Sequence, residues 1–144
     1  MKIRPMANED LAAVVSIQER ITRTPVTDRW RDMLANHLNN KHMPGIVADQ
    51  DGRVVGFIIG EVKVGGFGAE ISGILELVGV IPEKMGAGIG HALAQELLSH
   101  FKTQGVEDVL TSVMWDSGDM LAFFKNMGFD RSPYINLQLK LGRD

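Results

Sequence analysis

Three glycines at alternate positions follow a proline in the segment from Val78 to Leu93, which reads V-G-V-I-P-E-K-M-G-A-G-I-G-H-A-L. Apolar residues precede the proline as in a strand, and they resume after the glycines with the spacing of a helix. Backbone N–H groups freed by glycines at the start of a helix, where the macrodipole adds about half a positive charge, bind phosphate or pyrophosphate. The segment therefore predicts a strand, a phosphate-binding loop and a helix, with a nucleotide-like ligand on the loop.

Two widespread phosphate-binding motifs do not match this loop. A P-loop requires G-x-x-x-x-G-K-[ST], whereas here His91 and Ala92 follow the last glycine. The dinucleotide fingerprint G-x-G-x-x-G opens a βαβ unit. Here Gly86, Gly88 and Gly90 instead give G-x-G-x-G, and several expected elements precede them. The loop therefore fits neither of these classes.

The composition narrows the class of protein. The chain has 144 residues, so we expect one domain over 1–144 with an ordinary hydrophobic core. The absence of cysteine excludes disulfides, thiolate metal ligands and a thiol nucleophile. A net charge of −3 with 15 scattered basic residues argues against a nucleic-acid-binding face.

No apolar run approaches the roughly 20 residues of a membrane span, and the N-terminus lacks a signal core. We expect a cytoplasmic protein without metal, nucleic acid or membrane partner.

The hydrophobic patterns predict a mixed α/β fold. The expected order is a strand, two helices, three strands, a helix, a strand, a helix and one or two final strands. Asn8 is expected to cap the first helix. The expected ranges are 1–5, 8–21, 27–38, two strands on either side of a hairpin turn at 49–52, and then 71–80, 89–104, 106–115, 117–128 and 129–141.

The second helix is expected to bury one face. The spacing i, i+3, i+4, i+7 and i+8 is typical of a helix that packs on a core. The residues with this spacing are Trp30, Met33, Leu34, His37 and Leu38. Because His37 lies on that face, its expected role is structural.

The strand at 71–80 returns through a helix to a further strand, which predicts a parallel pair in an otherwise antiparallel sheet. A twisted mixed sheet with helices on both faces is the simplest architecture. Gly79 interrupts the apolar run of this strand, and a glycine there indicates a bulge or the close approach of another group. We expect a bulge at Gly79 to splay the sheet and to open a slot for a long, thin ligand.

Three segments together resemble the GNAT family, the GCN5-related N-acetyltransferases. The family's core segment reads V-x-P-x-x-[RQ]-x-x-G-x-[GA], and Val80, Pro82, Gly88 and Gly90 fall on its positions. The opening I-R-P-M-A-N-E-D-L-A-A-V is similar to the family's usual opening, and F-F-K-N-M-G-F is similar to its F-Y-x-x-x-G-F turn. The resemblance covers nearly the whole chain and implies a GNAT-like fold with the sheet splayed at a bulged strand.

The resemblance implies acetyl-CoA as acyl donor, with pantetheine along the splayed strands and pyrophosphate on the loop. By similarity, backbone groups of Val78 and Val80 bond the pantetheine arm and polarise the thioester carbonyl, an oxyanion-type contact worth about 3 kcal/mol per donor. The residues expected to bind the coenzyme are Val78, Gly79, Val80, Met85, Gly86, Ala87, Gly88, Ile89, Gly90, Ser117 and Phe124. A homodimer is expected from the resemblance alone.

The chain departs from the family pattern at positions that matter for chemistry. Met85 stands where the family usually has arginine or glutamine, so the loop loses a side-chain donor and weaker coenzyme binding is expected. Phe124 stands where many members carry the tyrosine that protonates the thiolate, and Ser117 where many carry asparagine. Tyr134, the chain's only tyrosine, is a weak candidate acid. Its alternative is an ordinary strand aromatic.

Glu76 is the candidate general base. Transfer to an amine requires removal of a proton, because an amine of pKa about 10.4 is protonated at neutral pH. Glu76 lies inside an apolar run that raises a carboxyl pKa, and many family members carry an acidic base on this strand. The alternative is that Glu76 faces solvent or pairs with a lysine. Glu61 and Glu70 are weaker candidates.

Three functional hypotheses remain open from the sequence. The first is direct transfer of an acetyl group from acetyl-CoA to a primary amine of a small molecule or a protein, without a covalent intermediate. The second is a non-catalytic acyl-CoA sensor or regulatory module, motivated by Phe124 and Met85. The third is a relative of the same fold that no longer binds the coenzyme. The sequence does not identify the acceptor.

Overall fold

The computed structural model describes residues 1–66 and 68–142. The chain divides into two compact units, Met1–Thr111 and Ser112–Asp144. The expectation of a single domain over the whole chain stays a prediction.

The first unit is built on a five-stranded mixed sheet with the strand order β1-β2-β3-β4-β5. Neighbouring strands are antiparallel except for β4 and β5, which are parallel. The mixed sheet with one parallel pair confirms the predicted topology. The strands are β1 Lys2–Pro5, β2 Gly45–Gln50, β3 Arg53–Val64, β4 Ile71–Val80 and β5 Asp108–Leu110.

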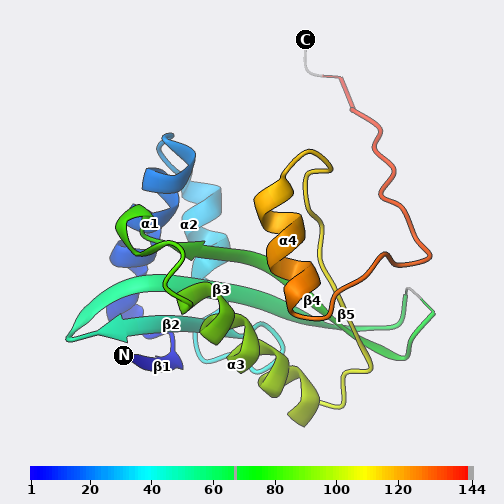
Figure 1. The fold of residues 1–144 in the computed structure, drawn as a ribbon, viewed down its shortest axis with the longest axis horizontal. Helices are drawn as coiled ribbons and strands as arrows, with labels where there is room; N and C mark the ends of the chain where they lie inside the picture. Colours follow the sequence, from blue (N-terminus) through cyan, green and yellow to red (C-terminus); the bar gives the residue numbers. More distant parts are fainter. Residues whose placement is uncertain (67, 143–144) are drawn as a thin grey trace. The chain divides into compact units, whose positions relative to one another are not determined.

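Helices lie on both faces of this sheet (Figure 1). The helices are α1 Leu11–Thr22, α2 Asp28–Ala35 and α3 Ile89–Thr103, with short 3-10 turns η1 Asn8–Asp10 and η2 Pro82–Lys84. On one face, Gly79 of β4 lies under Ile21 of α1. On the other face, Gly56 of β3 lies under Ile89 and Leu93 of α3. The predicted cover on both faces is confirmed.

The α3 side of the sheet is closed by one aromatic ring. Phe101 is 1% exposed, and its ring atoms lie 2.8 Å from a Cβ built on Gly73 and 3.0 Å from one built on Gly60. The two glycines therefore make room for the ring. Because Gly60 faces α3, the next residue on β3, Glu61, faces α1 and α2.

The start of the first helix differs from the prediction that Asn8 caps it. Asn8 lies within η1, and the Asp10 carboxylate instead accepts the Ala7 N–H at 2.8 Å. Arg4 holds that carboxylate with two hydrogen bonds of 2.7 and 3.0 Å. Asp10 takes the capping role because its carboxylate accepts hydrogen bonds from the Ala7 backbone and from the Arg4 guanidinium at the same time.

The β2–β3 hairpin turn, the start of α2 and the end of α3 lie where the sequence predicts them. Asp51 and Gly52 form the turn between β2 and β3 with φ 54° and 86°, the left-handed pair that two-residue hairpins favour. The Thr27 hydroxyl accepts the Trp30 N–H at 3.2 Å and caps α2. Gly105, at φ 78°, follows the end of α3.

The second unit contains α4, Gly118–Asn126. Phe124 is buried, and its ring meets the rings of Phe123 and Phe129 edge-on at 5.1 and 5.2 Å. Leu121 of the same helix is 46% exposed. Gly128, at φ 97°, follows the helix as expected.

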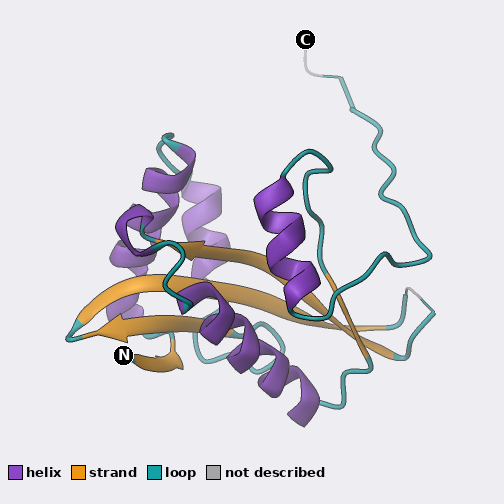
Figure 2. Ribbon diagram, viewed as in Figure 1, coloured by secondary structure: helices purple, strands orange, loops and turns teal. Residues whose placement is uncertain are grey.

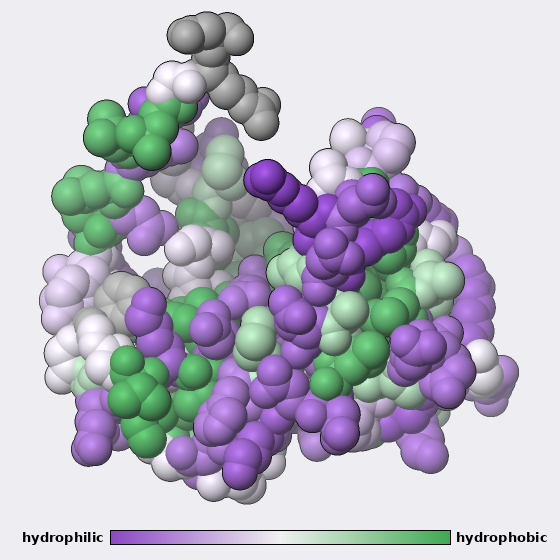
Figure 3. Space-filling model, turned by 180° about the vertical axis from the view of Figure 1, so that it is seen from behind, coloured by the Kyte–Doolittle hydropathy of each residue, from purple (hydrophilic) through white to green (hydrophobic). Residues whose placement is uncertain are grey.

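The predicted final strands are not formed. Residues 129–142 belong to no strand or helix, and Figure 2 draws them as loop. The segment has the alternation of a strand, but its four aliphatic residues are 82–87% exposed. Figure 3 shows that hydrophobic residues reach the surface on the face that it draws. Alternation of apolar and polar residues gives a segment one apolar and one polar face in the extended conformation. A strand also needs a neighbouring strand to hydrogen-bond its backbone. The exposed residues are Ile135, Leu137, Leu139 and Leu141.

Candidate functional site

The loop before α3 has the backbone conformation that glycine permits. Gly86 has φ 82° and Gly88 has φ 84°, values that cost a residue with a side chain about 1–2 kcal/mol. A Cβ built on either glycine has no heavy atom within 4 Å. Backbone conformation, and not lack of space, therefore requires glycine at both positions.

Amide groups at this end of α3 are not used by the helix. The helix begins at Ile89, and the N–H of Ala92 donates to the Gly88 carbonyl at 3.0 Å. The N–H groups of Ile89, Gly90 and His91 come earlier and have no helical carbonyl four residues back. Such amides, at the positive end of the helix dipole, can bind an anionic group. The arrangement has the loop-then-helix backbone that the sequence predicts.

Glu83 holds the turn that leads into the glycines. Its carboxylate accepts from Arg20 of α1 at 2.6 Å and from Arg53 of β3 at 3.2 Å. The hydrogen bond from Arg20 is the main cause that holds the pKa of Glu83 at about 2. Glu83 is therefore ionised at neutral pH, and it ties η2 to both a helix and a strand.

One edge of β4 loses its partner before the strand reaches this loop. β5 pairs with β4 only over residues 72–74. The next contact is the Thr111 hydroxyl, which donates to the Leu75 carbonyl at 2.9 Å. Within the described residues no strand pairs with the rest of β4 on that side, whereas β3 follows it to Val80. The predicted splay of the sheet is confirmed, with the backbone of 76–80 along its open edge.

The bulge on β4 lies at Glu76, which corrects its prediction at Gly79. Adjacent residues of β3, at 59 and 60, pair with Leu77 and Leu75, so Glu76 is the extra residue. Gly79 pairs in register with Phe57. A Cβ on Gly79 would lie 2.7 Å from the Phe57 ring. Glycine is therefore required here by the close approach of this ring, and not by a bulge.

The bulge decides which face of the sheet Glu76 occupies. Leu77 pairs with Ile59, which faces α1 and α2 because the following Gly60 faces α3. Regular alternation, followed back along the strand from Leu77, would turn Glu76 toward α3. The extra residue instead brings Glu76 to the α1 and α2 side, where its carboxyl is hydrogen-bonded to that of Glu61.

Glu61 and Glu76 form a pair of carboxyl groups. Burial raises the pKa of Glu76, and the hydrogen bond and negative charge of Glu61 raise it further. The Glu76 side chain is 28% exposed, so a ligand in solvent can reach it. A carboxyl with a raised pKa and solvent access is suited to accept a proton near neutral pH.

His37 approaches the same carboxyl from the turn after α2. Its side chain is 0% exposed, and its Nε2 lies 3.6 Å from the Glu76 Oε2. Sequence reasoning placed His37 on the buried face and missed this approach. The available signal was a single titratable residue on an otherwise apolar stripe, while Glu61 was noted only as a weaker candidate base.

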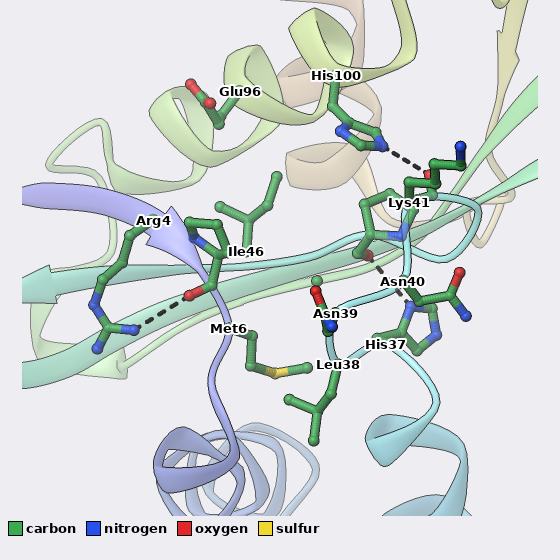
Figure 4. Close-up of a pocket in the computed structure, with 13 residues that line it drawn as sticks. Arg4, Met6, His37, Leu38, Asn39, Asn40, Lys41, Ile46, Glu96 and His100 are labelled. Carbon is green, nitrogen blue, oxygen red and sulfur yellow. Dashed lines mark hydrogen bonds between the residues drawn. The ribbon is translucent and has the colours of Figure 1, made fainter. Parts of the chain in front are cut away.

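A cavity of about 690 Å³ lies away from the glycine loop. Its walls come from β1, β2, the 37–45 segment and α3, and none of its lining residues belongs to 76–91. In Figure 4 the His37 ring stands at one side of this cavity, with its bond to the Pro44 carbonyl drawn. The lining residues are Arg4, Pro5, Met6, His37, Leu38, Asn39, Asn40, Lys41, Pro44, Gly45, Ile46, Glu96 and His100.

Ser117, Phe124 and Tyr134 belong to the second unit. Ser117 precedes α4 without a side-chain capping bond, and Phe124 is buried among aromatic rings. Tyr134 is 50% exposed, and its backbone N–H donates to the Ser132 hydroxyl at 3.1 Å. Their expected roles toward the coenzyme stay predictions.

Residues 1–66 and 68–142 include no helix that is both long and apolar enough to cross a membrane. The same residues hold no group of three or more His, Cys, Asp or Glu side chains placed to bind a metal ion.

Residues 11–129 match the family described as the acetyltransferase (GNAT) family. The chain therefore belongs to the GNAT acetyltransferases. It is 33% identical over 88 residues to a mycothiol acetyltransferase of Saccharomonospora viridis, and 34% identical over 86 residues to one of Kocuria rhizophila. Each match covers 59% of this chain, but only 29% and 28% of those proteins, so the chain spans under a third of their length.

Solved structures share the fold over nearly the whole chain. An aminoglycoside N-acetyltransferase in complex with CoA has a TM-score of 0.84 at 17% identity, covering 96% of this chain and 93% of that one. An acetyltransferase of Trypanosoma brucei has a TM-score of 0.77 at 23% identity, covering 97% and 99%. A transcriptional regulator from Bacillus halodurans has a TM-score of 0.83 at 19% identity, covering 97% and 99%. These likenesses establish the fold.

Proposed function

We propose that this chain transfers an acetyl group from acetyl-CoA directly to a primary amine of a small molecule or a protein. The observation that carries the proposal is the bulge at Glu76, which presents a carboxyl of raised pKa on the strand whose open edge leads to the glycine loop. Membership of the acetyltransferase family and a neighbour solved with CoA support the same donor.

The coenzyme's pyrophosphate lies, in this proposal, on the loop from Met85 to Gly90. The helix-terminal amides of Ile89, Gly90 and His91 supply donors without any lysine or arginine. The pantetheine arm follows the open edge of β4, where backbone groups of Val78 and Val80 bond it. One of these donors polarises the thioester carbonyl, a contact worth about 3 kcal/mol in the transition state.

Glu76 acts as the general base in this reaction. The ammonium group of the acceptor gives a proton to the Glu76 carboxylate, and the N–H electron pair stays on nitrogen. The free amine attacks the thioester carbon and a C–N bond forms. As the C–S bond breaks, the nitrogen loses its second proton, which passes through water to the departing thiolate and leaves a neutral amide. The thiolate can leave unaided, because a thiol of pKa about 8.5 is a tolerable leaving group. Otherwise it takes a proton from water or another hydroxyl, and Tyr134 is the candidate within the chain.

The acceptor is recognised first by charge. The neighbouring carboxyl groups of Glu61 and Glu76 attract a cationic amine. The names of the relatives, mycothiol acetyltransferase and aminoglycoside N-acetyltransferase, support amine-bearing small molecules as the first acceptors to examine. A homodimer in the cytoplasm belongs to the same proposal and is tested by light scattering and by cell fractionation.

The test is CoA release from acetyl-CoA across a panel of aminoglycosides, polyamines, amino sugars, amino acids and peptides. With the acceptor that gives turnover, Glu76→Gln is expected to lower kcat at neutral pH by about 10²- to 10⁴-fold, with CoA affinity unchanged. Glu107→Gln, at an exposed carboxylate just before β5, is the matched control and keeps the rate. Release at background level with every acceptor would reject the proposal.

A second candidate is a non-catalytic acyl-CoA sensor. Phe124 supports it, because the position that carries a proton-donating tyrosine in many relatives here holds a buried phenylalanine. Saturable acetyl-CoA binding without turnover, with the physiological partner present, would favour this candidate. A thermal shift separates both from a fold relative that binds no coenzyme, since ligand at about 100 times its Kd adds roughly 2.7 kcal/mol.

A further inference from the structure

The His37 ring is held in one tautomer by two carbonyls. Its Nδ1 lies 3.1 Å from the Met43 carbonyl oxygen and 3.2 Å from the Pro44 carbonyl oxygen. Carbonyl oxygens only accept hydrogen bonds, so Nδ1 carries the proton. Burial lowers the pKa of His37 against the opposing effect of those carbonyls and of the Glu61 charge. At neutral pH the ring is therefore neutral, with a lone pair on Nε2.

That lone pair has no partner within the described residues. Nε2 is fully buried and makes no hydrogen bond, a state that costs about 1–3 kcal/mol when nothing compensates it. The Glu76 Oε2 lies 3.6 Å away, which is beyond hydrogen-bond length. When Glu76 is ionised, both facing atoms carry lone pairs and neither can donate.

Protonation of Glu76 changes this pairing. A Glu76 O–H can donate to Nε2 once the carboxyl moves closer, and hydrogen bonds of catalytic groups are often long before substrate binds. Besides His37, the titratable group that faces Glu76 is Glu61 of β3. The buried residues of α1 and α2 are apolar, namely Val14, Val15, Ile17 and Leu34. Two acceptors therefore face a proton held by Glu76, the Glu61 carboxylate and the neutral Nε2 of His37.

We propose that His37 is a positioning residue, whose Nε2 accepts a hydrogen bond from Glu76 after Glu76 has taken the proton of the acceptor amine. The inference rests on the proposed function. In the step, the amine N–H bond breaks, an O–H bond forms on Glu76, and this O–H donates to Nε2 without leaving the carboxyl. The buried histidine thus favours the protonated base and sets the pH range in which Glu76 works.

Two substitutions separate this role from simple packing. In His37→Asn the amide N–H replaces the Nδ1 donor to the carbonyls and nothing replaces Nε2. In His37→Gln the amide oxygen reaches the place of Nε2. His100→Asn is the matched control, because His100 bonds the Lys41 carbonyl on the exposed side of α3.

The first measurement is the pH dependence of kcat/KM. His37→Asn is expected to shift the acidic limb to lower pH by about half a unit to one unit, the size of one neutral hydrogen bond. His37→Gln and His100→Asn are expected to leave the limb in place. A lower rate with an unmoved limb in His37→Asn would overturn the proposal, because loss of packing alone predicts that result.

The second measurement needs neither an acceptor nor a stable variant. In the wild-type protein, ¹⁵N spectra of labelled histidine are expected to show His37 protonated on Nδ1 alone, and ¹³C spectra to show Glu76 titrating at a raised pH. A proton on Nε2 at neutral pH would overturn the inference even if the enzyme turns over. Absence of turnover with these spectra as expected would reject the proposed function and leave the contact standing.

Discussion

Restoring a cationic side chain to the glycine loop is expected to tighten CoA binding. Met85 is 58% exposed and sits immediately before Gly86, the first of the left-handed glycines. In the proposed complex this places residue 85 beside the pyrophosphate, where a thioether donates no hydrogen bond. Met85→Arg supplies the planar, charged donor that phosphate prefers.

The size of the gain follows from the site. A hydrogen bond to a charged group contributes about 1.5–3 kcal/mol, and exposure at residue 85 lets water screen part of it. Glu83 does not compete strongly for the new arginine, because Arg20 and Arg53 already bind its carboxylate. A net gain of about 1–2 kcal/mol tightens the Kd for CoA roughly 5- to 30-fold.

Isothermal titration with CoA and with pantetheine measures this gain. Pantetheine lacks the pyrophosphate, so its affinity is expected to stay the same in Met85→Arg. Met85→Leu keeps the shape without the charge and is expected to bind CoA like the wild type. An unchanged or weaker affinity for CoA, or an equal gain with pantetheine, would refute the placement of the pyrophosphate on this loop.

Two further predictions concern the scaffold of the site. Gly88→Ala is expected to cost about 1–2 kcal/mol of unfolding free energy in a guanidinium titration, because φ 84° strains any residue with a Cβ; an unchanged midpoint would contradict this. The bond from Arg4 lowers the pKa of Asp10 below 3.8, so its stabilisation is present above that pH and is lost as pH falls through the lowered value. Asp10→Asn is expected to cost about 1.5–3 kcal/mol at pH 7 and less in acid. Urea titrations at several pH values measure the difference, and a constant difference would argue against this linkage.

Local patterns in the sequence predicted most of the first unit. The range of β4 agrees at both ends, and α3 begins at the predicted Ile89. The positive φ angles of Gly52, Gly86 and Gly88 agree with turns predicted from glycine spacing. These features depend on residues near one another in the chain, so composition and spacing are enough to predict them.

Features that depend on a partner were predicted less well. The alternating segment at 129–141 was predicted as one or two strands and belongs to none. β5 was predicted over 106–115 and pairs only over Asp108–Leu110. A strand exists only where another strand satisfies its backbone, and neither alternation nor β-propensity shows whether that neighbour is present.

For the site itself, the sequence determined the glycine loop, the helix start and the presence of Glu76 on the strand before them. Tertiary structure alone decided what surrounds that carboxyl. A one-residue bulge turned Glu76 toward Glu61, and a turn 39 residues earlier brought His37 within 3.6 Å. The physical reason is that spacing along the chain sets which residues share a local element, whereas register between strands sets which side chains share a face.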